Sequence, residues 1–212
     1  MVDSGLQYHE LTDVHDPLFL NWLDAIQMGF PPDEQMLASF FLRILFSKEC
    51  NEKDAMLYHL LAVLGSDRQM VGLLMYQLFP DQQVCYLWYI WVDEMLRGQG
   101  IGSAAYLEMI RRTRAEMPDV RALVYEIDRP DQAQTKDVRI EAERRIEFYR
   151  RLGMKIATNL VYHQSVERRD QPMKQMYLCI HSLLPVTGDE AYQLLNSIFG
   201  RYIEDAATAV LE

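Results

Sequence analysis

A chain of 212 residues, half of them hydrophobic, can bury one sizeable core and is short for two independent domains. Its formal charge of -10 argues against nucleic acid as a partner, because phosphate binding needs a basic face, and fits a cationic substrate better. The chain has no uncharged apolar stretch of about 18 residues and no signal-like start, so we expect neither membrane insertion nor secretion.

The first part of the chain predicts two helices followed by three strands. Apolar residues recur at helical spacing from Asp16 to Phe46, and GFPPDEQ in the middle supplies a stop, two prolines and acidic residues for the next first turn. Strands are predicted over 55–64, 70–79 and 84–92, joined by short polar turns. Three successive strands joined by short turns are typical of an antiparallel meander.

The second part mixes the two kinds of element. A glycine-rich segment leads into a helix ending near Glu116, a strand over 120–128, a polar loop and a helix that stops at Gly153. Residues 154–166 and 173–184 are predicted to form a hairpin. A capping box formed by Thr187 and Glu190 opens a last helix, which carries apolar residues as far as Ile203 on one side.

We therefore expect an α/β (α+β) fold with a mixed, mostly antiparallel sheet of six to seven strands flanked by helices. Residues 1–186 are assigned to one domain and residues 187–212 to a C-terminal helical extension. This extension packs on its own domain or on a second subunit of a homodimer, and the first is the default.

Three glycines, Gly98, Gly100 and Gly102, stand within five positions where a strand turns into a helix. Glycine allows positive φ and removes the Cβ that would hold a ligand away from the main chain. Unpaired amides at a helix start converge on one point, and the helix end adds roughly half a positive charge. The segment is predicted to bind an anion, of which phosphate and pyrophosphate are the commonest.

Three phosphate-binding motifs compete for this segment. A P-loop would need GxxxxGK followed by Ser or Thr, which the sequence lacks. The dinucleotide fingerprint GxGxxA fits Gly100, Gly102 and Ala105, and the next strand ends with Glu126 and Asp128. That fingerprint opens a run of parallel βαβ units, whereas a meander precedes these glycines, so a dinucleotide-binding oxidoreductase is the weaker alternative.

The third motif carries a family resemblance. VDEMLRGQGIG resembles the acyl-CoA signature of the GCN5-related N-acetyltransferase (GNAT) superfamily: Val92, four variable residues, Arg97 and then GxGxG/A. The later EFYRRLGM resembles the second motif of the same superfamily, an aromatic pair followed by a glycine and a hydrophobic residue. The ordered pair is more specific than either motif alone. The resemblance covers about residues 57–184 and implies a GNAT-like fold whose two central strands splay apart.

The resemblance implies that acetyl-CoA is the co-substrate. Its pyrophosphate would be held mostly by main-chain amides, and its pantetheine arm by main-chain groups of the strand that precedes the glycines. A bulge in that strand would help to open a gap for the arm. The predicted binding residues are Ile90, Val92, Arg97, Gly98, Gln99, Gly100, Ile101, Gly102 and Ser103.

Acyl transfer to an amine needs a neutral nucleophile, so a base or a water relay must take a proton. Glu126, near the end of its strand, is the first candidate and Asp128 the second, with Tyr86 and Tyr89 as outside candidates. The resemblance places Tyr149 where many relatives carry a tyrosine that acts as a general acid. Hydrogen-bond stabilisation of the thiolate is the role we expect, because the reference pKa of tyrosine, about 10, exceeds that of a thiol, about 8.5.

The second motif departs from the family pattern in two places. Ala142 and Arg145 stand where many relatives have Asn and Ala, which suggests that this helix begins earlier, near Asp137. The loop 129–136 is then longer than usual, and we expect it to cover the acceptor site.

The sequence thus predicts a cytoplasmic N-acetyltransferase that acts on a primary amine of a small molecule or peptide. The three cysteines lie far apart without CxxC spacing and outside both motifs, so reduced thiols and direct attack in a ternary complex are expected. The scattered histidines argue against a metal site. The alternative from another class is a CoA-binding regulatory or interaction module of the same fold.

Overall fold

The computed structural model describes residues 5–32, 34–164, 174–200, 203 and 208–212. The chain divides into two compact units. Unit 1 comprises Met1–Leu78 and Leu87–Pro118, and unit 2 comprises Phe79–Tyr86 and Asp119–Glu212. The predicted boundary between residues 186 and 187 stays a prediction.

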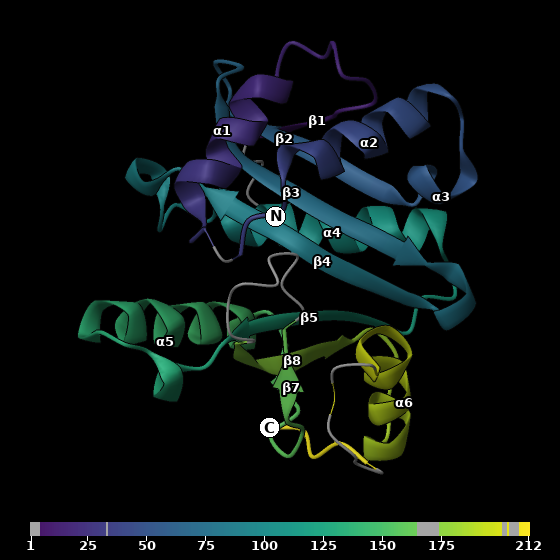
Figure 1. Ribbon diagram of the computed structural model, residues 1–212, viewed down its shortest axis with the longest axis vertical. Helices are drawn as coiled ribbons and strands as arrows, with labels where there is room; N and C mark the ends of the chain where they lie inside the picture. The colour runs from purple at the N-terminus through teal and green to yellow at the C-terminus, as the bar shows by residue number, and fades with distance from the viewer. Residues whose placement is uncertain (1–4, 33, 165–173, 201–202, 204–207) are drawn as a thin grey trace. The chain divides into compact units, whose positions relative to one another are not determined.

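Eight strands hydrogen-bond in the order β1-β2-β3-β4-β5-β8-β6, and β7 also pairs with β8 (Figure 1). β4 and β5 run parallel, whereas β1–β2, β2–β3, β5–β8, β6–β8 and β7–β8 are antiparallel. The expected mixed, mostly antiparallel α/β fold is confirmed. The sheet exceeds the expected six to seven strands because it includes the short strand β1 and splits one predicted strand into β6 and β7.

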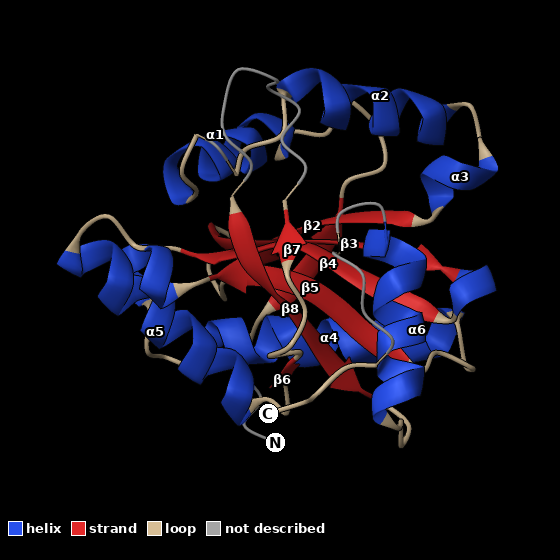
Figure 2. Cartoon of the chain, turned by 60° about the horizontal axis from the view of Figure 1, so that its bottom comes forward, coloured by secondary structure: helices blue, strands red, loops and turns tan. Residues whose placement is uncertain are grey.

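Unit 1 places two helices on one side of its strands and one on the other. α1 and α2 lie on one side of β2 to β4, and α4 lies on the opposite side (Figure 2). The elements that contribute to unit 1 are β1 (Gln7–Glu10), α1 (Phe19–Gly29), α2 (Ala38–Glu49), α3 (Lys53–Met56), β2 (Tyr58–Leu64), β3 (Met70–Phe79), β4 (Val84–Val92), η2 (Glu94–Leu96) and α4 (Ile101–Glu116).

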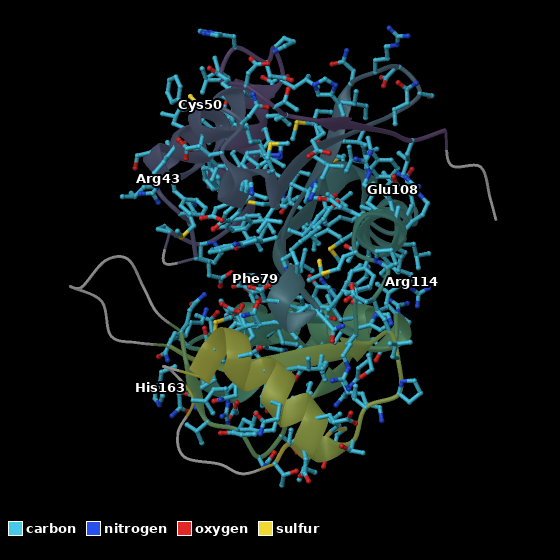
Figure 3. All side chains as sticks on the ribbon, turned by 90° about the vertical axis from the view of Figure 1, so that its right-hand side faces the viewer. Arg43, Cys50, Phe79, Glu108, Arg114 and His163 are labelled. Carbon is cyan, nitrogen blue, oxygen red and sulfur yellow. The ribbon has the colours of Figure 1, made fainter. Side chains whose placement is uncertain are left out.

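Aromatic side chains build the core beneath α1 and α2. Trp22 is fully buried, its Nε1 donates to the Leu61 carbonyl (3.1 Å), and its ring meets Phe41 edge-on at 5.1 Å. Because the buried indole of Trp22 keeps a hydrogen-bond acceptor, it contributes its large apolar area to the core without leaving an unpaired donor. At the surface of α2, Arg43 lies over the Phe40 ring at 5.8 Å (Figure 3).

The pleat of β4 is irregular in its second half. The rings of Trp88 and Tyr89 both contact phenylalanines of α2, whereas Ile90 packs with Ala105 of α4 on the other side. Successive side chains of a regular strand point to opposite faces. Two consecutive residues of β4 thus contact the same helix, which departs from regular alternation, and the bulge that the resemblance implies for this strand stays a prediction.

Unit 2 packs one helix on each face of its sheet. β5 pairs with β8 without interruption from Ala122 to Asp128, so alternate residues of β5 point to opposite faces. Val124 packs in the core formed with α6, whereas Tyr125 contacts α5. The elements that contribute to unit 2 are η1 (Pro80–Gln82), β5 (Ala122–Asp128), η3 (Pro130–Gln132), α5 (Lys136–Arg151), β6 (Lys155–Ile156), β7 (Tyr162–His163), β8 (Gln175–Ser182) and α6 (Gly188–Phe199).

The strand predicted over 154–166 is two short strands. Ile156 exchanges two backbone hydrogen bonds with Glu212, and the Thr158 N–H donates to the Val210 carbonyl (2.9 Å). The backbone between β6 and β7 is thus occupied by the end of the chain, a partner that local pattern cannot reveal. The predicted continuation to Val166 lies outside the described residues.

The last helix begins as predicted and ends earlier. Thr187 and Glu190 form the expected capping box, and α6 ends at Phe199. Ile203, which we expected within the helix, forms a β-bridge with Tyr162 instead. Among the described residues no helix has both the length and the apolar character needed to cross a membrane.

Candidate active site

The glycine segment connects β4 to α4 within unit 1. Asp93 opens the short turn η2 by accepting a backbone N–H with its side chain (2.9 Å), and Arg97 Nε donates back to the Val92 carbonyl (3.3 Å). Gly98 and Gly100 have φ angles of 81° and 86°. Both glycines are therefore required by the left-handed backbone that redirects the chain from the strand end into the helix.

Six consecutive main-chain amides, from Gly98 to Ser103, have no acceptor among the described residues. The first hydrogen bond of α4 joins the Ala104 N–H to the Gly100 carbonyl (2.9 Å). A Cβ built on Gly98 or Gly100 would meet nothing within 4 Å. The segment therefore combines unpaired donors, open space and a helix start, which is the arrangement that binds an anion.

The arginines of α4 are engaged elsewhere. Arg111 and Arg112 both bind Glu108, at 2.7 and 2.8 Å, and Arg112 also reaches Glu10 at 3.2 Å. Main-chain amides and the adjacent Arg97, rather than these helix arginines, are thus the donors that the segment offers to an anion.

The first candidate base, Glu126, lies in unit 2 on the face of β5 that α6 covers. Tyr86 Oη donates to Glu126 Oε2 at 3.0 Å, and Tyr162 Oη approaches Oε1 at a longer 3.4 Å. Burial raises the pKa of Glu126 to about 7, although hydrogen bonds from Tyr86, Gln164 and Tyr162 oppose this rise. A carboxyl with a pKa near neutrality can both accept a proton and release it at physiological pH.

The second candidate, Asp128, is part of an ion-pair cluster. It binds Arg145 at 3.0 Å and also contacts Lys174. Arg145, which departs from the family pattern, thus joins α5 to the end of β5. The helix itself starts at Lys136 with Thr135 as its N-cap, one residue before the expected start. The Asp128 carboxylate is thus held by two ion pairs within the protein. Glu126 is therefore the better candidate for the proton acceptor.

Tyr89, an outside candidate, fastens the connection between α1 and α2. Its hydroxyl donates to the Glu34 carbonyl (2.7 Å) and accepts the Met36 N–H (3.0 Å). With both bonds made, this buried phenol has a packing and positioning role in unit 1.

Tyr149 lies on α5 with only 6% of its surface exposed. Its ring contacts Tyr125 at 4.7 Å and Phe148 at 4.9 Å. Burial raises the pKa of Tyr149 well above its usual value, although Arg145 opposes the rise. Tyr149 therefore keeps its proton, which suits it to donate a hydrogen bond and makes full proton transfer to a thiolate strongly unfavourable.

Glu126 and Tyr149 lie on opposite faces of the unit 2 sheet. Glu126 follows Tyr125 directly in a regular strand, and Tyr149 packs on the Tyr125 side. The two side chains thus project from opposite faces of this sheet.

The loop 129–136 lies against α5 rather than over Glu126. Arg129 binds Asp131 at 2.8 Å and lies over the Tyr177 ring at 5.0 Å. Pro130 and Asp131 line a cavity of about 410 Å³ together with residues of α5, β6 and β8. Tyr177 faces the same side of the sheet as Tyr125, so this loop does not cover the candidate base.

Sequence reasoning missed three neighbours of the candidate base, Tyr162, Gln164 and Phe199. They lie 36 or more residues beyond Glu126 along the chain. Tyr162 and Gln164 belong to a predicted strand that is interrupted in the structure, and Phe199 belongs to a helix whose packing partner the sequence did not indicate. The sequence around Tyr162 carries no signal that says which carboxylate its phenol meets. Among the described residues no group of three or more His, Cys, Asp or Glu side chains could hold a metal ion.

Comparison with known proteins assigns the family. The sequence model of the acetyltransferase (GNAT) family matches residues 21–154, more than half of the chain. A search of curated proteins gives no match.

Solved structures share the fold. A protein assigned to the GNAT acetyltransferases from Bacteroides thetaiotaomicron superposes with a TM-score of 0.63 at 20% identity, covering 92% of this chain and 98% of its own. A spermidine N-acetyltransferase SpeG chimera from Vibrio cholerae and hSSAT gives 0.60 at 8% identity, covering 90% and 99%. The ribosomal-protein-S18-alanine N-acetyltransferase from Escherichia coli gives 0.54 at 15% identity, covering 86% and 96%. With the glycine segment and the matched family pattern, the chain belongs to the GNAT family of acetyltransferases.

Proposed function

We propose that this protein is an acetyl-CoA-dependent N-acetyltransferase that acetylates a primary amine by direct attack in a ternary complex. Family membership supports acyl-CoA-dependent N-acyl transfer in general. The observation that carries the proposal is the run of amides from Gly98 to Ser103 without an acceptor among the described residues, next to open space at two glycines.

The glycine segment fits the diphosphate of an acyl-CoA. The amides from Gly98 to Ser103 would bind its oxygens, and Arg97 stands beside them with its charge. Main-chain groups of Ile90 and Val92 would pair with the pantetheine arm. The Val92 carbonyl already accepts from Arg97, but a carbonyl oxygen has two lone pairs and can accept a second hydrogen bond.

Glu126 is proposed as the proton acceptor for the amine. An alkylammonium group with a pKa near about 10.4 costs about 4.6 kcal/mol to deprotonate beforehand at pH 7. Glu126 takes that proton, directly or through water, as the nitrogen forms its bond to the acyl carbon. Its pKa of about 7 then allows the proton to leave for solvent.

Tyr149 is proposed to stabilise the leaving group. When the carbon–sulfur bond breaks, its electron pair stays on sulfur, and the Tyr149 hydroxyl donates a hydrogen bond to the resulting thiolate. The thiolate then takes a proton from solvent, since its reference pKa of about 8.5 exceeds neutral pH. Tyr149 keeps its own proton because of its buried position.

A small cationic amine is the proposed acceptor class. Structures of this fold include one spermidine N-acetyltransferase and one ribosomal-protein-S18-alanine N-acetyltransferase, so the fold alone does not choose between small amines and protein amino groups. The formal charge of -10 favours encounter with a small cation.

A thermal-shift titration and a thiol-release assay test the proposal. We expect acetyl-CoA to raise Tm, NAD(P) to leave it unchanged, and at least one amine of a panel to release free CoA. Glu126→Gln should bind acetyl-CoA normally but lose kcat by roughly 100-fold or more. A shift without turnover for any amine would indicate a binding module instead, and the absence of a shift at millimolar acetyl-CoA would overturn the proposal.

A further inference from the structure

A cluster in unit 2 joins the candidate base to the C-terminal helix. The two oxygens of Glu126 meet different phenols, Oε2 with Tyr86 of β4 at 3.0 Å and Oε1 with Tyr162 of β7 at 3.4 Å. Gln164, two residues after Tyr162, adds a side-chain hydrogen bond. The carboxyl is therefore oriented by donors from two strands that are distant in sequence.

One ring of α6 contacts both phenols. Phe199, with 4% of its surface exposed, meets Tyr86 at 5.5 Å and 86°, and Tyr162 at 5.3 Å and 68°. Edge-to-face pairs of this kind have a preferred geometry and so restrict where each ring can lie. The helix that carries Phe199 is itself fixed by its capping box and by buried side chains, Ala191, Leu194 and Leu195.

We infer that Tyr86 and Tyr162, held in place by Phe199, are positioning residues that aim the Glu126 carboxylate and stabilise its charged form. This inference rests on the proposed function, in which Glu126 takes the proton of the amine. The physical reason is that a hydroxyl donating to a carboxylate stabilises its charged form. Without these two donors, only Gln164 and a backbone hydrogen bond would oppose the effect of burial on the pKa of Glu126. The carboxyl would then stay protonated to higher pH, and a protonated carboxyl cannot act as a base.

The surroundings of this carboxyl hold few other groups that titrate. Among the described residues, Asp128 lies two positions further along the same face of β5, where it binds Arg145 at 3.0 Å and contacts Lys174. The Cys179 thiol of β8 pairs with Tyr125 and so lies on the other face, and burial raises its pKa well above its usual value, which keeps it neutral. Gln164 is uncharged and α6 presents the apolar Phe199, so Tyr86 and Tyr162 are the titratable donors that face the carboxylate.

The pH dependence of kcat/KM tests the inference. In a Tyr86→Phe/Tyr162→Phe double variant the acid limb of the profile should move up by about one pH unit, because the ionised form has lost two donors. Activity should fall about 10-fold at about pH 6.5 and recover near about pH 9, where the carboxyl is ionised in both proteins. Tyr192→Phe, the same kind of substitution at a tyrosine of α6, should leave the profile unchanged.

A milder change tests the part played by α6. Phe199→Leu keeps an apolar side chain of similar size in the core but removes both edge-to-face contacts. We expect its acid limb to move in the same direction as that of the double variant, by a smaller amount. A loss of activity by the same factor at every pH would instead indicate damage to the fold and would overturn the role assigned to Phe199.

A titration of the ligand-free protein provides a readout that needs no acceptor. Carbon-13 NMR of the glutamate carboxyls, assigned with Glu126→Gln, should show a higher pKa for Glu126 in the double variant than in the wild type. If the wild type turns over but neither this pKa nor the acid limb moves, the inference is overturned and the proposed function stands. If the wild type turns over no amine, the proposed function fails and the inference with it.

Discussion

Glycines of unit 1 serve two different purposes, and the space around each distinguishes them. A Cβ at Gly98 or Gly100 would meet nothing within 4 Å, whereas a Cβ at Gly72 would lie 2.6 Å from the Trp91 carbonyl oxygen. Gly72 lets two strands approach each other, and the other two leave room for something outside the chain. The sequence shows all three simply as glycines, so this distinction needs the coordinates.

Gly100→Asn should weaken acetyl-CoA binding while leaving the fold intact. Asparagine tolerates the left-handed backbone better than most residues, so we expect a cost of about 1 kcal/mol and a Tm lower by about 2–4 °C. Its side chain fills the space beside the amides, so acetyl-CoA affinity measured by calorimetry should fall at least about 10-fold.

Gly72→Ala is the matched control for that variant. It should lower Tm more, because its Cβ meets backbone that cannot turn away, and whatever folded protein remains should keep the glycine segment open. Normal acetyl-CoA affinity in Gly100→Asn would show that the anion does not approach this part of the main chain.

The sequence predicted those features of the candidate site that depend on local backbone conformation. It did not predict the residues that contact the candidate base. Gly98 and Gly100 do adopt the positive φ that their spacing predicted, and Tyr149 lies on a helix that starts at the expected place. The phenol of Tyr162 reaches Glu126, and the ring of Phe199 reaches that phenol, only through strand pairing and helix packing. Such contacts depend on tertiary structure, which one sequence without relatives does not specify.

At the scale of elements, a buried charge cluster holds the strand that sequence reasoning missed. Glu10 of β1 contacts His59 of β2 at 2.9 Å, Lys48 of α2 at 3.5 Å and Arg112 of α4 at 3.2 Å. The Lys48 side chain is only 4% exposed. β1 has four residues and no apolar face, so its pairing is reinforced by charge and could not be predicted from a hydrophobic pattern.

Glu10→Gln should destabilise the protein by about 3 kcal/mol at neutral pH, because it removes the carboxylate charge that Lys48, His59 and Arg112 share in a largely buried site. Burial opposes ionisation of Glu10, but the hydrogen bond and charge of His59, with Lys48 and Arg112, outweigh it and lower the pKa. The stabilisation is therefore complete above the usual glutamate range and is lost as pH falls through the lowered value. Urea unfolding at several pH values measures both effects.

Glu143→Gln is the control for this prediction. It removes a carboxylate that binds Arg139 at 2.9 Å on the surface of α5, where both side chains are at least half exposed. Such a pair contributes little, so we expect a change below about 1 kcal/mol at every pH. If both substitutions lower the free energy of unfolding equally, the Glu10 cluster contributes no more to stability than an exposed ion pair.

For the whole molecule, the distribution of charge along the sequence does not show where a charged ligand binds. Residues 97–116 and 139–151 each carry two more arginines than acidic residues, and in the sequence alone this local excess is compatible with an anion between two basic helices. In the structure Arg111 and Arg112 bind Glu108, Arg139 binds Glu143, and Arg145 binds Asp128. Charge counted along a helix therefore does not by itself indicate an anion site, and the proposed site rests instead on the backbone amides of Gly98 to Ser103, which have no acceptor among the described residues.

The stability of the whole chain should record the ionisation of Glu126. Its folded pKa of about 7 lies above the usual value of 4.5, so between these values the folded chain binds more protons than the unfolded chain. Stability therefore falls as pH rises through this window. Glutamine cannot ionise, so the stability of Glu126→Gln relative to wild type should increase by about 2–3 kcal/mol between about pH 5 and about pH 8.

Urea unfolding midpoints of the wild type and of Glu126→Gln at about pH 5 and about pH 8 measure this change in relative stability. Asp128→Asn is the control variant. Asp128→Asn removes a carboxylate charge that both Arg145 and Lys174 bind, so that variant should lose stability at about pH 8 rather than gain it. If Glu126→Gln shows the same difference from wild type at both pH values, the carboxyl does not titrate near neutrality. Glu126 would then lack the property that qualifies it as the base, because a carboxylate with an ordinary pKa takes a proton from an amine far less readily.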